Sequence, residues 1–176
     1  MMGLPFTTVS FAAVEQGGDF SPEHAIEGLL SRCATGIAAC WETYCSCDAN
    51  NMLLAFETVS RYIPVLTTVA RQSSQQRKNA LDLAARSAIL KGTLALECLS
   101  PIATVECALE AVKLSKETGS ASLHLGALSR LAWTYFNAKQ PALFPLALAP
   151  AEKSFALLQS VSSKISLAPT IIGEDQ

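Results

Sequence analysis

The sequence predicts an all-α fold in which antiparallel helical hairpins stack as a short right-handed solenoid of six to seven helices. Half of the 176 residues are hydrophobic, Ala and Leu dominate, and no segment alternates like a strand. Small or apolar residues also recur at offsets of 0, 12, 16 and 19, first as Gly92, Thr104, Ala108 and Ala111 and forty residues later as Ala132, Phe144, Leu148 and Ala151. Such spacing suits two helices that cross closely, and stacked hairpins build a solenoid.

The first helix is predicted to begin at Ser21-Pro22-Glu23, where a serine N-cap precedes a proline in the first turn. Apolar residues recur from there at helical spacing as far as Tyr44, and residues 47–51 have the composition of a turn. The second helix covers residues 52–69. We expect Pro64 to kink or restart it, because proline lacks the backbone N–H and clashes with the preceding turn.

The third helix follows a turn at residues 73–78, in which Ser73 and Gln76 have capping-box spacing, and it extends to Leu99. Ser100-Pro101 repeats the start signal for a fourth helix, which Gly119 ends. The core-facing apolar stripe predicted for that fourth helix consists of Ile102, Val105, Leu109 and Val112.

A fifth helix is expected over residues 123–139, with Leu128, Leu131, Ala132 and Tyr135 turned inward. Residues 141–150 contain three prolines and cannot form one regular helix, so the last helix runs from Ala151 to about residue 164. The domain organisation is therefore a flexible N-terminal arm at 1–20, a helical repeat domain at 21–164 and a frayed tail at 165–176.

The run ALEAVKLSKETGSASLHLGALSRLAWTYFNAKQ resembles the tetratricopeptide-like helical repeats of fungal regulatory proteins, those with an N-terminal helix-turn-helix or nucleotide-binding module. Gly92 and Ala132 match the small positions of such repeats, and Leu131 and Tyr135 match core positions. Lys91 departs from the pattern, since it occupies a position where leucine is usual. The chain has no phosphate-binding glycine loop and no recognition-helix pattern, so the resemblance implies a regulatory, protein-binding role without either of those activities.

Charge and hydropathy exclude several classes of partner. The 13 basic and 15 acidic residues form no basic stripe, which argues against direct nucleic-acid binding by this chain. No apolar run approaches the ~20 residues that a membrane span requires. A secretory signal begins with a positively charged region, and no Lys or Arg precedes Arg32. We therefore expect an intracellular protein, cytoplasmic or nuclear, with reduced thiols and no membrane contact.

Cysteine and histidine patterns do not predict a catalytic or metal site. Cys33, Cys40, Cys45 and Cys47 include no C-x-x-C pair, so we expect free thiols, although Cys45 and Cys47 would be redox-sensitive if exposed. His24 and His124 belong to no catalytic signature. Glu106 and Glu110 lie one turn apart without an accompanying E-x-x-H motif. The sequence thus predicts neither an enzyme nor a cofactor.

The leading functional hypothesis is a non-catalytic scaffold or regulatory module that binds a peptide or helix in a concave groove. The register of the repeats assigns one set of residues to that groove: Arg86, Thr93, Glu97, Ser129, Trp133, Phe136 and Asn137. Trp133 and Phe136 are the expected anchors, because aromatic residues contribute disproportionately to binding. The competing interpretation places both in the core, as is common for aromatic residues at helical spacing.

Two alternatives of other classes stay open. One is a helical enzyme or small-ligand binder with its pocket between hairpins. The other is a structural protein that forms a homodimer through the apolar residues Leu143, Phe144, Leu146 and Leu148.

Overall fold

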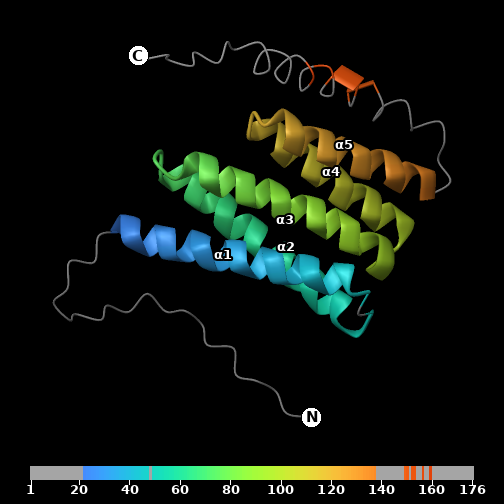
Figure 1. Ribbon diagram of the computed structural model, residues 1–176, viewed down its shortest axis with the longest axis horizontal. Helices are drawn as coiled ribbons and strands as arrows, with labels where there is room; N and C mark the ends of the chain where they lie inside the picture. Colours follow the sequence, from blue (N-terminus) through green and yellow to red (C-terminus); the bar gives the residue numbers. More distant parts are fainter. Residues whose placement is uncertain are drawn as a thin grey trace, which may run out of the picture.

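The computed structural model describes residues 22–47 and 49–137, together with residues 149, 150, 152, 153, 156 and 159. These residues contain five long helices and no strand: α1 (Pro22–Cys45), α2 (Ala49–Gln72), α3 (Arg77–Cys98), α4 (Pro101–Glu117) and α5 (Ala121–Asn137). The chain reverses direction at each connection, so successive helices are antiparallel (Figure 1). The all-α prediction is confirmed.

The five helices form two layers. Helices α1, α3 and α5 lie side by side, because α1 contacts α3 and α3 contacts α5. Helices α2 and α4 lie behind them, and their backbones do not approach each other closely (Figure 1). Helix α3 contacts all four of the others, which explains why it contributes more buried residues than any other helix. This arrangement creates two distinct features: the outer side of α1, α3 and α5, and a groove between α2 and α4.

Two pairs of helices lie close together at a glycine. At Gly36 of α1, the ring of Tyr62 on α2 occupies the space that a Cβ would need, with ring carbons 2.9 Å from that position. At Gly92 of α3, a Cβ would lie 3.5 Å from the Cα of Ala108 on α4. The close crossing predicted from the first copy of the repeat is therefore present.

The other members of that first copy are buried at the same crossing. Thr104, Ala108 and Ala111 are all inaccessible to solvent, and the Thr104 hydroxyl donates to the carbonyl of Ala95 on α3 at 3.0 Å. In the second copy Ala132 is half-buried on α5, whereas Phe144, Leu148 and Ala151 lie outside the described residues.

The helix ends follow the local signals. Ser100 is the N-cap of α4 and accepts from the amide of Ala103 at 3.5 Å, with Pro101 in the first turn. Gly119, just beyond the C-cap of α4, has φ +71°, the left-handed conformation that glycine adopts without strain. Ser73 accepts from the amide of Gln76 at 3.1 Å, which forms half of the predicted capping box.

Pro64 does not restart α2, which continues from Ala49 to Gln72. The proline is on the exposed side of the helix, so the carbonyl of Ser60, to which it cannot donate, is not forced into the core. The opposite side of α2 is held by buried Val59 and Leu66. Packing on that side keeps the helix continuous.

Part of the predicted core was wrong. Ile102 and Leu109, assigned to the inner stripe of α4, are 73% and 46% exposed. The buried side of α4 instead consists of Thr104, Cys107, Ala108, Ala111, Leu114 and Ser115. Small side chains on this side let α3 and α5 approach, and the larger aliphatic side chains are displaced outward.

Several predictions fall outside the described residues. The arm at 1–20, the tail at 165–176, the dimer residues Leu143, Phe144, Leu146 and Leu148, and most of the helix expected after Ala151 are among them. Five long helices are described where six to seven were predicted. No helix within the described part of the chain is long and apolar enough to cross a bilayer.

Candidate functional site

Trp133 and Phe136 form an exposed aromatic pair near the end of α5. Trp133 is 53% exposed and Phe136 is 65% exposed, and their rings are stacked with centroids 5.7 Å apart and an interplanar angle of 24°. Leu131 and Tyr135 of the same helix are buried. The aromatic residues of α5 are therefore on different sides of the helix, with Tyr135 in the core and the stacked pair on the surface.

Helices α3 and α5 are neighbours that run in the same direction, so residues of one helix can be paired with residues at the same level along the other. Ile89 of α3 approaches Gly126 of α5, with its Cδ1 4.0 Å from the position of a Cβ on Gly126. Further along, Leu96 of α3 and Thr134 of α5 line the same small cavity of about 130 Å³. Trp133 follows Gly126 by two helical turns and is therefore close to the level of Leu96.

Four other residues predicted for the groove are exposed in the structure. Arg86 and Glu97 are on α3, and Ser129 and Asn137 are on α5. The Asn137 amide donates to the carbonyl of Trp133 at 2.8 Å, so it helps to end the helix beneath the aromatic pair. No hydrogen bond or ion pair in the described residues joins the α3 members to the α5 members.

Thr93 was predicted to belong to this surface, but it does not. It is fully buried and its hydroxyl donates to the carbonyl of Ile89 at 2.9 Å. Thr93 is on α3, the helix that contacts all four of the others. A polar residue inside a helix can be buried at little cost when its hydroxyl bonds to its own backbone.

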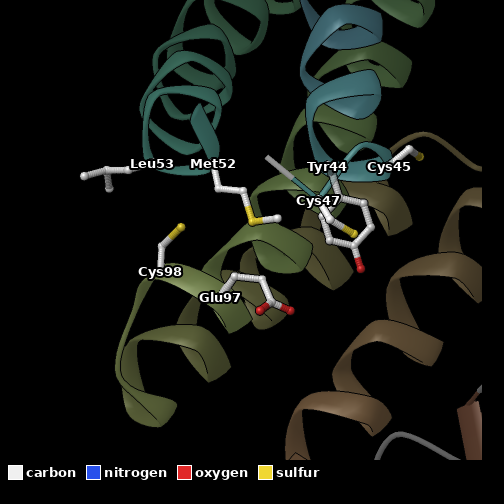
Figure 2. Close-up of a pocket in the computed structure, with 7 residues that line it drawn as sticks. All are labelled: Tyr44, Cys45, Cys47, Met52, Leu53, Glu97 and Cys98. Atoms are coloured by element: carbon white, nitrogen blue, oxygen red, sulfur yellow. The ribbon is translucent and has the colours of Figure 1, made fainter. Parts of the chain in front are cut away.

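The six cysteines divide into two groups. Cys33, Cys40 and Cys107 are buried, and burial raises the pKa of each thiol, so these behave as small apolar residues. Cys45, Cys47 and Cys98 are accessible, and all three line one cavity of about 700 Å³ (Figure 2). The other lining residues are Tyr44, Met52, Leu53 and Glu97.

This cavity combines the turn after α1 with the start of α2 and the end of α3. Figure 2 shows the sulfur atoms of Cys47, Cys98 and Met52 around the opening, whereas Cys45 points away from it. Cys47 has φ +54°, an unusual conformation for a residue other than glycine. Burial and the neighbouring carboxylate of Glu97 raise the pKa of Cys98, so its thiolate form is disfavoured at neutral pH.

Cys45 and Cys47 are separated in the structure from the cysteines that precede them in the sequence, and all of these thiols are free, as expected. Cys33 and Cys40 are close in sequence but belong to the core between α1 and α2, where Tyr62 lies beside them. Cys98 is far away in sequence and joins the exposed pair only through the packing of α3. Across the described residues, no three His, Cys, Asp or Glu side chains are arranged to hold a metal ion.

The one serine–histidine contact in the described part of the chain has the geometry of a structural hydrogen bond. Ser115 is fully buried and donates to the carbonyl of Val112 at 2.9 Å, so its oxygen accepts from Nδ1–H of His124 at 3.1 Å. A nucleophilic serine would have to donate to the imidazole and be reachable by substrate. Neither condition is met at this position.

Lys91 and Glu110 pair across the contact between α3 and α4. The Nζ–Oε2 distance is 2.6 Å, and the lysine side chain is mostly covered. This explains how a lysine occupies a position where the resemblance implied leucine, because its charge is neutralised by the facing helix. Glu110 is thereby engaged in an ion pair.

Comparison with known proteins gives no relative: no protein-family model, curated protein or solved structure matches the chain significantly.

Proposed function

We propose that this chain is a non-catalytic protein-interaction module that binds a peptide or helix against the outer side of α3 and α5. The observation that supports the proposal best is the stacked pair of Trp133 and Phe136, which is exposed although both residues are large and apolar. Aromatic residues in such positions are frequent anchors of protein interfaces, because they bury a large area at a small entropic cost.

In this proposal the two aromatic rings would bury an apolar side chain or the apolar side of a partner helix. Arg86 and Glu97 carry opposite charges on α3 and would orient the partner through contacts at the edge of the interface. Ser129 and Asn137 would supply hydrogen bonds along α5. Thr93 has no part, because it is buried.

The layered arrangement is consistent with the tetratricopeptide-like interpretation. In such arrays the first helix of each hairpin lines the binding surface, and here α1, α3 and α5 are the helices that lie side by side. We accordingly propose a short repeat scaffold, with a regulatory role in the cytoplasm or nucleus, of the kind implied by the resemblance to fungal regulators.

A second candidate is a small-ligand-binding domain, and the observation in its favour is the sulfur-lined cavity (Figure 2). Its volume is within the range of ligand sites, but few polar groups converge in it. We therefore prefer the interaction module, and the two candidates differ in which residues are needed for binding.

Selection of peptides from a displayed random library, under reducing conditions, tests the interaction proposal. The affinity of a selected peptide is then measured by titration calorimetry for the wild type and for Trp133→Ala. We expect binding at least about 30-fold weaker in the variant, as for an interface hot spot.

The control is Ile102→Ala, which removes an exposed apolar residue from the two-helix layer and should leave the affinity unchanged. Selected peptides that bind Trp133→Ala as tightly as the wild type would contradict the proposal. If chemical modification of the Cys47 thiol prevented ligand binding, the result would instead support the cavity lined by Cys47 as the binding site.

A further inference from the structure

A groove between α2 and α4 is distinct from the aromatic surface of α5. The backbones of α2 and α4 do not approach each other closely, and a hollow of about 440 Å³ lies between the two helices, with α3 at its base. Ile63, Leu81 and Leu114 give it a buried apolar floor, one residue from each of the three helices.

Three cations from three different helices line this groove. Arg71 is in the last turn of α2, Arg77 is the first residue of α3, and Lys113 is in the second half of α4. Because successive helices alternate in direction, the end of α2, the start of α3 and the end of α4 are on the same side of the helical array (Figure 1). All three side chains are exposed, and none has an ion-pair partner within the described part of the chain.

The acidic residues of the groove do not neutralise these cations. Glu110 is already paired with Lys91, which leaves Glu117 as the remaining carboxylate. The hydroxyls of Ser60 and Thr67 donate to carbonyls of their own helix, at 2.7 and 3.1 Å. The groove therefore offers a bound anion its charged donors, the two guanidinium groups and the ammonium group.

One further polar group in the wall suits a peptide. Pro64 has no N–H, so it cannot donate to the carbonyl of Ser60, and both residues line the groove. That carbonyl therefore lacks the helical donor that a residue with an N–H would supply at position 64. The exposed cations also suit the polar rim of a peptide interface better than a ligand site, which would bury most of a small molecule.

We propose that the groove between α2 and α4 binds a short acidic segment of a partner protein, with apolar side chains on Ile63, Leu81 and Leu114 and carboxylates at Arg71, Arg77 and Lys113. Arginine favours this role because its planar guanidinium group binds a carboxylate through two parallel hydrogen bonds. This site is independent of the aromatic pair, since it lies in the other layer.

Fluorescence anisotropy with a labelled synthetic peptide of Leu, Ile, Glu and Asp tests the proposal, beside a matched peptide in which Gln and Asn replace Glu and Asp. We expect the acidic peptide to bind more tightly and its affinity to fall as ionic strength rises. In the variant Arg71→Gln/Arg77→Gln we expect binding about tenfold weaker. Arg32→Gln, which removes an exposed cation of α1, is the matched control and should bind like the wild type.

Equal binding of the two peptides, or an unchanged affinity in Arg71→Gln/Arg77→Gln with circular dichroism like that of the wild type, would overturn the proposal. Trp133→Ala should leave this binding intact, so the outcome is separable from the test of the aromatic surface. Loss of acidic-peptide binding in Trp133→Ala would place the site on α5 and would also overturn it.

Discussion

At the scale of single residues, His124 shows how a buried hydrogen bond fixes a helix connection. Ser115 at the end of α4 accepts from the imidazole, and Ser115 in turn donates to Val112. Burial and the nearby charge of Lys116 lower the pKa of His124 from its ordinary value of 6.5. The folded protein therefore prefers the neutral imidazole.

The lowered pKa predicts how stability depends on pH. The contribution of His124 is fully present above about pH 6.5, because the imidazole is then neutral in both states. As the pH falls below 6.5 the unfolded chain binds the proton first, so the free energy of unfolding decreases until the folded-state pKa is passed. Urea unfolding at pH 7.5 and 5.5 measures this decrease.

His124→Gln removes the titrating group and keeps a polar side chain at the α4–α5 connection. The loss of stability between the two pH values should be smaller in this variant than in the wild type. The same loss in both proteins would show that other groups cause the pH dependence.

Two residues from the same predicted surface had different outcomes for a physical reason. Trp133 and Thr93 were both assigned to the groove by helical register, which fixes direction around one helix but not the neighbours of that helix. Trp133 is on α5, the last of the three side-by-side helices among those described, and is exposed. Thr93 is on α3, which has a helix on each side, and is buried.

At the scale of helices, local signals were reliable and the choice of packed side was not. Ser100-Pro101 and Gly119 mark the ends of α4 because caps depend on a few adjacent residues. The packed side of α4 depends on contact with α3, where small residues allow the closest approach. Counting large apolar residues therefore selected Ile102 and Leu109, which are exposed.

The crossing at Gly92 gives a prediction for α3 and α4 as a pair. A Cβ there would lie 3.5 Å from the Cα of Ala108 and 3.7 Å from the Cγ of Arg130, which are ordinary contact distances. Because alanine is favoured over glycine in a helix by about 1 kcal/mol, Gly92→Ala should leave the free energy of unfolding unchanged or raise it by up to that amount. Gly92→Leu should lower it by about 1–3 kcal/mol through overpacking.

Chemical denaturation measures both variants, and Gly28→Ala is the control for helix propensity alone. A Cβ at Gly28 on α1 would meet no atom within 4 Å. A loss of more than about 1 kcal/mol in Gly92→Ala would mean that the two helices cross more closely than the structure shows.

At the scale of the whole molecule, the two layers present different chemistry. The three-helix layer has the aromatic pair on α5, and the two-helix layer has the groove with Arg71, Arg77 and Lys113. Sequence reasoning placed Trp133 and Phe136 on one side of α5 and left open whether that side was core or surface, and both residues are exposed. It missed the groove and the grouping of Cys98 with Cys47, since both depend on packing between distant segments.

The proposed binding surface requires Trp133 to be a surface residue of a stable fold. The most direct test is the free energy of unfolding of Trp133→Ala, with Leu131→Ala on the same helix as the buried control. We predict a loss of about 1 kcal/mol or less for Trp133→Ala, which removes one exposed stacking contact, and about 2–5 kcal/mol for Leu131→Ala. A loss of about 3–5 kcal/mol for Trp133→Ala would instead show that Trp133 belongs to the core and would contradict the proposed binding surface.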